Sequence, residues 1–529
     1  MRDWRHVAHT IASVVFVLVS RAFPFDFAEA SLDLRPLFAA PAKGERAPVP
    51  LFDAMVAADL TGDGRKEIVL PGSDGRLRVL RIVGPQNRPT LAPWAAVDTR
   101  VEGDQLTGRS YLTAAPLEKG ARASLVLALP RGIFNVRIEG NPPRPQWVPL
   151  FDRTFFDPGE PASRPKRLDF LVDLDGDGIP EIWMPHLEGI EFWRRKPGGS
   201  SWEKIETPPP LVARARQSAG ALPISASAAQ PPMRSVAFNY TLVYPTFNLM
   251  DLDGDGRSEM VVFVRDSVAR PPTVRAECYA LRDSLHFSTS PIQTRVVQAE
   301  RGSQAFLDLN GDGFLDLLRV ESNLDFVSPH TTVEAFLSSP AREEVFDQPT
   351  TRLTTHDPVG MVLYGDWNRD GVADLAYSEF EYTFGSTDDL VSLILGREIS
   401  VLLRFVYGNR NGFPAKADQD LRLQIRNRCF NPRLFPPLSM EGDFNGDGLA
   451  DLLVRSRLDR FDLYLSRGSG KAILPVKTGL QLSTRAAATF SAEAEASCRL
   501  DDLDGDGCTD LLLTSDSERP AITVLLSRP

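Results

Sequence analysis

The segment DLDGDGIPEIWM at residues 173–184 contains the pattern that decides the fold. It follows the form D-x-[D/N/T]-x-D-G-x-x-[D/E], with oxygen-bearing side chains at positions 1, 3, 5 and 9 and glycine at position 6. Glycine there permits the positive φ angles of a tight loop. Seven copies in one chain indicate a repeat protein whose loops share one role. The copies begin at Asp59, Asp173, Asp251, Asp308, Asp366, Asp443 and Asp502.

The oxygen atoms of this pattern are the ligands that a hard cation prefers, and Ca²⁺ takes six to eight of them. Each loop therefore predicts one Ca²⁺ site, up to seven in all, with the backbone carbonyl of position 7 completing the set. The loop is not an EF-hand, because the closing acid stands at position 9 instead of 12 and the flanks are not helical. Thr61 at position 3 and Arg369 at position 4 predict weaker binding in the first and fifth loops.

The predicted ligands are written here loop by loop, at positions 1, 3, 5, 7 and 9. They are Asp59, Thr61, Asp63, Arg65 and Glu67; Asp173, Asp175, Asp177, Ile179 and Glu181; Asp251, Asp253, Asp255, Arg257 and Glu259; Asp308, Asn310, Asp312, Phe314 and Asp316; Asp366, Asn368, Asp370, Val372 and Asp374; Asp443, Asn445, Asp447, Leu449 and Asp451; and Asp502, Asp504, Asp506, Cys508 and Asp510.

The flanks of the loops are short and rich in β-forming residues, as in EMVVFV at residues 259–264. Each loop is therefore expected to join two strands of a hairpin. Further turn signals such as Asn411-Gly412 follow within the units, so each unit should hold about four antiparallel strands.

The spacing of the loops predicts eight units. The first aspartates recur every 57–59 residues, except for two gaps of 77–78 residues that carry insertions and a first gap of 114 residues. That first gap is twice the period, and a shift of 57 residues lays PLEKGARASLVLAL, from Pro116, onto the unit that begins at Asp59. The second unit thus keeps its strand and has lost its acids.

Radially repeated four-stranded units form a β-propeller. The sequence predicts an all-β, eight-bladed propeller over residues 31–529, with SLDLRPLF at 31–38 supplying the missing outer strand of the last blade; seven blades are the alternative. The expected blades are 51–107, 108–165, 166–235, 236–300, 301–357, 358–434, 435–490 and 491–529, the last closed by 31–50.

These loops, together with VYGNRNGF at residues 406–413, resemble the FG-GAP or VCBS repeats of integrin α-subunit propellers and of many secreted bacterial proteins. The resemblance covers nearly all of residues 31–529. It implies a calcium-binding propeller that serves in binding, adhesion or scaffolding.

Residues 1–30 have the features of a secretory signal peptide: Arg2 and Arg5, an apolar run from Ile11 to Val19, and Ala28-Glu29-Ala30 as the cleavage site, with Ser20-Arg21-Ala22 as a rival site. The run is too short to span a bilayer. We therefore expect an exported protein, periplasmic, cell-surface or extracellular, with no transmembrane segment in the mature chain.

Enzymatic motifs are absent from the sequence. There are 6 histidines and no HExxH, GxSxG or phosphate-binding loop, so we expect no enzyme; the alternative is a secreted carbohydrate-active enzyme such as a polysaccharide lyase. The net charge of −11 argues against nucleic-acid binding and is explained by the acidic loops. The 4 cysteines are too sparse for a disulfide framework, which leaves one or two disulfides open.

The insertions at 207–235 and 379–400 should lie on the face opposite the calcium loops, where a protein or glycan ligand would bind. The first reads as a flexible linker. In the second, Phe380, Tyr382 and Phe384 are hypothesised to contact the partner, with local packing as the alternative. Three recurring tryptophans, Trp94, Trp147 and Trp202, either pack between outer strands or stack on sugars.

Overall fold

The computed structural model describes residues 26–38, 47–99, 110–129, 132–151, 166–186, 189–196, 199, 201–208, 211, 214–221, 236–243, 246–266, 269–282, 285–299, 302–323, 330–355, 359–380, 398–430, 437–466, 476–481, 495–516 and 519–528. Strands dominate these residues, so the all-β class is confirmed. Two short 3-10 turns, η1 (Phe52–Ala54) and η3 (Asn427–Phe430), lie between strands.

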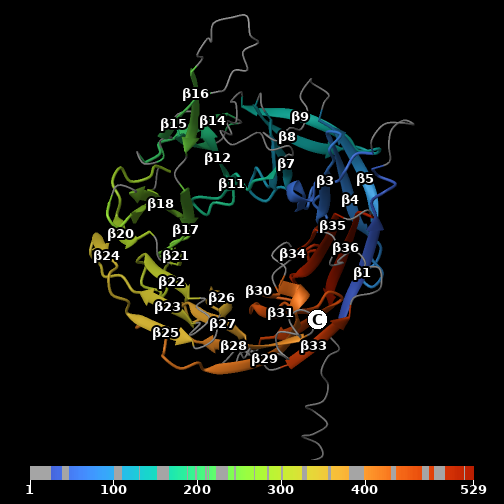
Figure 1. The fold of residues 1–529 in the computed structure, drawn as a ribbon. Coiled ribbons are helices and arrows are strands. Elements are labelled where there is room, and N and C mark those ends of the chain that lie inside the picture. The colour runs from blue at the N-terminus through green and yellow to red at the C-terminus, as the bar shows by residue number, and fades with distance from the viewer. Residues whose placement is uncertain are drawn as a thin grey trace, which may run out of the picture.

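Eight sheets, each with four antiparallel strands, stand as blades around a central axis and close into a ring (Figure 1). The eight-bladed prediction is confirmed and the seven-bladed alternative is wrong.

Blade 1 contains β2 (Val56–Ala58), β3 (Glu67–Pro71), β4 (Arg76–Val83) and β5 (Thr90–Asp98). Blade 2 contains β6 (Tyr111–Ala115), β7 (Ser124–Leu129), β8 (Gly132–Glu139) and β9 (Arg144–Phe151). Blade 3 contains β11 (Leu171–Val172), β12 (Glu181–His186), β13 (Gly189–Arg195) and β14 (Trp202–Ile205). Blade 4 contains β17 (Thr246–Met250), β18 (Glu259–Asp266), β19 (Thr273–Tyr279) and β20 (Gln293–Gln298).

The second half of the ring repeats this plan. Blade 5 contains β21 (Ser303–Leu307), β22 (Asp316–Asn323), β23 (His330–Phe336) and β25 (Thr351–Thr355). Blade 6 contains β26 (Val359–Gly365), β27 (Asp374–Phe380), β28 (Glu398–Val406) and β29 (Gln419–Arg426). Blade 7 contains β30 (Leu438–Gly442), β31 (Asp451–Arg457), β32 (Arg460–Leu465) and β33 (Val476–Gln481). Blade 8 contains β34 (Glu495–Asp501), β35 (Asp510–Asp516), β36 (Ala521–Arg528) and β1 (Asp26–Asp33). Two short strands, β10 (Lys166–Arg167) and β24 (Glu343–Val345), add a parallel fifth strand to blades 2 and 4.

An N-terminal strand closes the ring, but it lies earlier in the chain than residues 31–38. β1 runs from Asp26 to Asp33 and pairs antiparallel with β36, from Asp26 opposite Arg528 to Asp33 opposite Ala521. The sequence placed the strand too late because it assigned residues up to Ala30 to the leader. Ala28 and Ala30 are buried in the cluster that joins blades 8 and 1. The outer edge of blade 8 is thereby paired.

Blade 2 occupies the slot that the doubled spacing predicted. Its loop 116–123 joins β6 to β7 as the acidic loops join the first two strands elsewhere. Leu117, at the position of Leu60, is buried like Leu60. The Ala123 amide donates to the Asp59 carbonyl at 3.0 Å, which ties this loop to its neighbour in blade 1.

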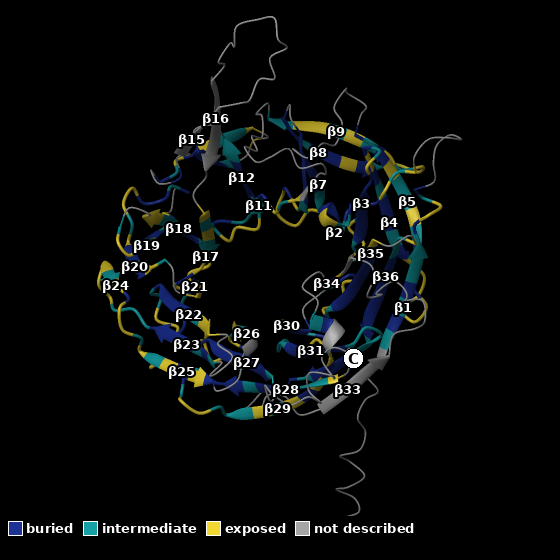
Figure 2. Cartoon of the chain, in the orientation of Figure 1, coloured by how far each residue is buried: buried dark blue, intermediate teal, exposed yellow. Residues whose placement is uncertain are grey.

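The core lies between adjacent blades, because the second and third strands of a blade bury both faces. All five residues of β3 are buried (Figure 2). Val69 and Leu77 of blade 1 pack in one cluster with Leu125 and Leu127 of blade 2. Each such side chain contributes about 1.5–3 kcal/mol through burial. This repeated packing holds the loops at fixed positions.

β15 (Arg214–Ala221) pairs antiparallel with β16 (Val236–Val243). The prediction of a flexible linker over 207–235 was therefore wrong for residues 214–221. Tyr382 and Phe384 lie outside the described residues. All four cysteines are buried and unpaired. Within the described part of the chain, no helix is long and apolar enough to cross a membrane.

Candidate metal centres

The seven acidic loops connect the first strand of a blade to the second, and neighbouring loops are hydrogen-bonded to one another. In four of them, the loops of blades 1, 4, 6 and 8, the backbone amide at position 8 donates to a carbonyl at position 1 or 2 of the preceding loop. Examples are Lys66 to Leu503 at 2.8 Å, Ser258 to Leu174 at 2.9 Å and Ala373 to Leu309 at 3.0 Å. The predicted ligands therefore lie along one rim of the ring.

Position 1 is the centre of each loop. One oxygen of its aspartate accepts the amide of the position-6 glycine, at 2.5–3.1 Å, in all seven loops. In the last loop Asp502 also accepts the Gly505 amide at 2.8 Å. Gly505 and Gly507 have φ angles of 78° and 85°, which turn both amides inward.

Positions 5 and 7 are linked in the same way in every loop. The position-5 aspartate accepts the amide of position 7 at 2.7–3.0 Å. The side chain at position 7 varies from Arg65 to Cys508, because only its backbone takes part in the loop. The prediction that the backbone carbonyl of position 7 is a metal ligand stays a prediction.

The acid at position 9 is buried at the base of the loop and is at most 5% exposed in every copy. One of its oxygens accepts the amide of position 2 at 2.8–3.1 Å; the donors are Leu60, Leu174, Leu252, Leu309, Trp367, Phe444 and Leu503. The closing acid thus anchors the base of the loop to its first turn.

Carboxylate oxygens converge in three loops. Ligand atoms lie within 4.8 Å of one another in the groups Asp173, Asp175 and Glu181; Asp251, Asp253 and Asp255; and Asp502, Asp504 and Asp510. Oxygens at this spacing can share one cation, since Ca²⁺ binds oxygen at about 2.3–2.6 Å.

Burial makes the closing acids hard to ionise in the absence of a cation. Burial, followed by the charges of the loop aspartates, raises the pKa of Glu181 to about 8 and that of Asp510 to about 8. The same causes raise the pKa of Glu259, Asp316 and Asp451 to about 7 and that of Asp374 to about 6. A bound divalent cation reverses the sign of these interactions. The donor set fits calcium in these loops.

The closing acid is aspartate in blades 5 to 8, and there its second oxygen is also tied to the backbone. In blades 5, 7 and 8 it accepts the amide of a serine at the end of the third strand, at 2.7 Å from Ser338, Ser466 or Ser527. Each serine hydroxyl also donates to the carbonyl of position 8. In blade 6 the Gly408 amide takes this place at 3.0 Å. No sequence motif marks these serines, because the number of residues between the acid and the serine varies with the length of the hairpin between them.

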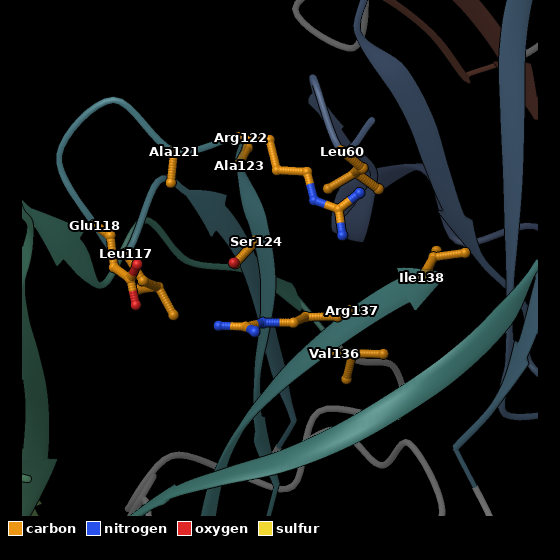
Figure 3. Close-up of a pocket in the computed structure, with 10 residues that line it drawn as sticks. All are labelled: Leu60, Leu117, Glu118, Ala121, Arg122, Ala123, Ser124, Val136, Arg137 and Ile138. Carbon is orange, nitrogen blue, oxygen red and sulfur yellow. The ribbon is translucent and has the colours of Figure 1, made fainter. Parts of the chain in front are cut away.

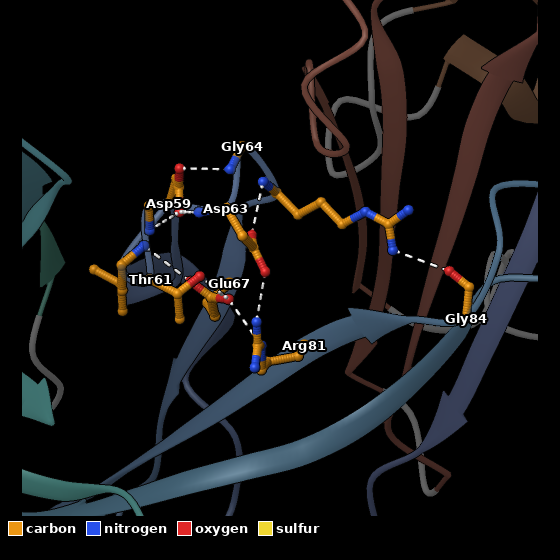
Figure 4. Close-up of polar contacts among 10 residues, drawn as sticks. Asp59, Thr61, Asp63, Gly64, Glu67, Arg81 and Gly84 are labelled. Carbon is orange, nitrogen blue, oxygen red and sulfur yellow. Dashed lines mark hydrogen bonds and ion pairs between the residues drawn. The ribbon is translucent and has the colours of Figure 1, made fainter. Parts of the chain in front are cut away.

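The first loop has a different counter-charge (Figure 4). Arg81 on β4 places Nη2 at 2.6 Å from Asp63 Oδ2 and Nε at 3.1 Å from Glu67 Oε1. Its guanidinium also lies 5.1 Å from the centroid of the Trp94 ring. Thr61 supplies only a hydroxyl, 3.4 Å from Glu67 Oε1. Two of the predicted ligands therefore already share one guanidinium as a counter-charge, and this loop fits calcium poorly.

The aromatic candidates pack against neighbours. Phe380 meets Phe430 edge to face at 5.2 Å between ring centroids. Trp147 meets Phe134 at 6.0 Å, and Trp202 lies 5.8 Å from Phe151. Phe380, Trp147 and Trp202 therefore pack against neighbouring aromatic rings, as the packing alternatives describe.

Comparison with known families agrees with the loop geometry. Residues 443–513, which run from the loop of blade 7 into β35 of blade 8, match the model of the FG-GAP-like repeat. This stretch is an FG-GAP-like repeat. The recognition of FG-GAP repeats from the sequence is thereby confirmed, and the propeller is consistent with an integrin-α-like fold. No curated protein matches the chain.

Similar solved structures share little sequence with this chain. An Agrocybe aegerita lectin described as recognising non-reducing terminal N-acetylglucosamine is 16% identical, with 72% of this chain and 82% of that chain covered and a TM-score of 0.37. Sqt1 from Chaetomium thermophilum is 10% identical, with 91% and 97% covered and a TM-score of 0.39.

Proposed function

We propose that the protein is an exported, calcium-stabilised β-propeller that acts as a binding, adhesion or scaffolding module. The observation that carries this proposal is the shared geometry of the loops: every one buries an acid at position 9 and binds the glycine amide of position 6 with its first aspartate. FG-GAP repeats are typical of extracellular domains, which supports export.

Calcium is proposed to bind in the loops of blades 3 to 8. We expect about six ions, because Arg81 provides the positive charge in the loop of blade 1 and blade 2 has no acids. At ~1,000 times the dissociation constant, each independent site adds about 4 kcal/mol to the free energy of unfolding. The role is structural: the bound ions hold the first hairpin of each blade.

Metal analysis of the purified protein, combined with thermal unfolding before and after chelation, tests this proposal. A calcium content near six and a large fall in melting temperature on chelation are expected. A protein with little calcium and an unchanged melting temperature would show that the loops are ordinary Asp-Gly turns.

If a signal peptide is removed on export, its cleavage site must leave β1 intact for the ring to close as described. Cleavage after Ala30 removes five of the eight residues that pair with β36, so we favour the rival site after Ala22. The mass of the mature N-terminus, measured on secreted protein, tests this choice. A chain that begins at Ser31 would contradict it.

The second candidate is a secreted carbohydrate-active enzyme such as a polysaccharide lyase on the same fold. The two candidates differ in whether basic and carboxylate side chains converge in a substrate pocket. Incubation of the protein with a panel of acidic polysaccharides, monitored at the absorbance of unsaturated products, distinguishes them. Product formation favours the enzyme, and binding without product favours the module.

A further inference from the structure

The loop of blade 2 borders a partly open cavity of about 190 Å³ where the other blades have an acidic site (Figure 3). Leu60, Val136 and Ile138 form apolar parts of its wall. The polar groups around it include Ser124, Arg122 and Arg137. Since no aspartate stands in this loop, the cavity differs in charge from every other slot on the rim.

The strand register aligns this cavity with the Arg81 site of blade 1. In blade 1, Ile68 pairs with Leu80, and the next residues toward the acidic loop are Glu67 on β3 and Arg81 on β4. In blade 2, Leu125 pairs with Val136, and the next residues toward the loop 116–123 are Ser124 on β7 and Arg137 on β8. Arg137 therefore occupies the position of Arg81, and Ser124 that of the closing acid.

The two arginines differ in what they contact. Arg81 binds carboxylates of its own blade, Asp63 and Glu67. Arg137 has no hydrogen-bond or ion-pair partner among the described residues. The other charges at the cavity are paired: Arg122 with Glu139 at 3.2 Å, and Glu118 with Arg195 of blade 3 at 3.0 Å. The Arg137 guanidinium thus has no carboxylate at the register position where Glu67 pairs with Arg81 in blade 1.

We propose that this cavity binds the carboxylate of a small organic anion, held by the Arg137 guanidinium and the Ser124 hydroxyl. Blade 1 shows the same contact made within the chain, where a guanidinium at this register position holds two carboxylates. Paired N–H donors of arginine match the two oxygens of a carboxylate. The apolar wall of Leu60, Val136 and Ile138 accommodates the carbon atoms next to it. The site is independent of calcium, because it contains no predicted metal ligand.

Ligand-observed NMR titration of the full-length protein tests the proposal. The probes are N-acetyl-L-glutamate and D-glucuronate, which present carboxylates on an amino-acid or a sugar scaffold. The neutral controls are N-acetyl-L-glutamine amide, in which both carboxyl groups are amides, and D-glucose. At least one acid should bind, and its neutral counterpart should bind at least tenfold more weakly. The acid that binds more tightly shows whether the cavity prefers a carboxylate on an amino-acid or on a sugar scaffold. Binding of neither acid at tens of millimolar, or equal binding of acid and control, overturns the proposal.

Variants assign the binding to this cavity. Arg137→Gln should weaken the acid at least tenfold, while Arg144→Gln, an exposed arginine on β9 of the same blade, should leave it unchanged. Ser124→Glu restores the closing acid and should both block the probe and raise the melting temperature, as expected if it pairs with Arg137 in the way Glu67 pairs with Arg81. Binding that persists in both Arg137→Gln and Ser124→Glu would place the anion elsewhere and refute the assignment.

Discussion

The loops of blades 1 and 8 lie side by side and follow the same sequence pattern, but their charges are balanced differently. They touch through the hydrogen bond from the Lys66 amide to the Leu503 carbonyl. In blade 8, Asp502, Asp504 and Asp510 gather their oxygens within 4.8 Å. In blade 1, Arg81 lies between Asp63 and Glu67. Loops with the same sequence pattern therefore have different counter-charges, and in blade 1 a side chain on the next strand supplies a positive charge.

The largest effect should appear when calcium is removed, because six loops are proposed to bind it and Arg81 supplies a positive charge inside the loop of blade 1. The pKa of Glu181 and of Asp510 is raised to about 8 in the folded chain, above the ordinary range of an unfolded carboxylic acid. Protonation therefore favours the folded state. This stabilisation is full below about pH 4 and is lost as the pH rises through about 8.

The free energy of unfolding of protein dialysed against calcium-free buffer should thus fall between pH 5 and pH 8. Denaturant unfolding at several pH values measures it, and saturating calcium should flatten the curve. A calcium-free curve that rises over this range contradicts the prediction.

Loss of one acidic site should be the next largest effect. Asp510→Ala removes a predicted ligand and leaves the amides of Leu503 and Ser527 without their acceptor. Together these changes should cost about 3–5 kcal/mol at saturating calcium. Metal analysis should show one ion fewer.

The matched control for this change is Glu441→Ala, which removes an exposed acid on β30 outside the loops. It should retain the full ion count and stability. If the two variants bind equal amounts of calcium, the loop of blade 8 is not a metal site.

The sharpest test of the comparison converts blade 1 into a metal loop. Arg81→Gln should destabilise the calcium-free protein by about 1–2 kcal/mol, because the buried Glu67 loses its partner. Adding Thr61→Asp supplies the missing position-3 carboxylate, and the double variant should bind one ion more than the parent. Isothermal calorimetry counts the sites.

Arg65→Gln is the control in the same loop, since the Arg65 side chain contacts the Gly84 carbonyl and no loop acid. Its ion count should equal that of the parent. Should the double variant also keep the parent count, Arg81 does not stand in for calcium.

The sequence predicted the features that depend on local spacing. The seven loops, the eight blades and the degenerate second unit follow from a fixed period and from the fixed positions of Asp and Gly within it. Arg81 could not be found this way, because its contact with Glu67 depends on the hairpin register of β3 and β4. The predicted closing strand at 31–38 shares only three residues with β1, and the cause is similar: pairing with β36, and not the local pattern, sets the start of the strand at Asp26.

The smallest effect concerns the serines that tie the closing aspartate to the third strand. The Ser527 hydroxyl donates to the Thr509 carbonyl, while its amide donates to Asp510 at 2.7 Å. Ser527→Ala keeps the amide bond and removes the hydroxyl, so it should cost about 1 kcal/mol and leave the calcium count unchanged. Ser258→Ala serves as a control, because only the backbone amide of Ser258 bonds to the neighbouring loop. If Ser527→Ala instead loses an ion, the serine shapes the metal site itself and its role extends beyond holding the hairpin.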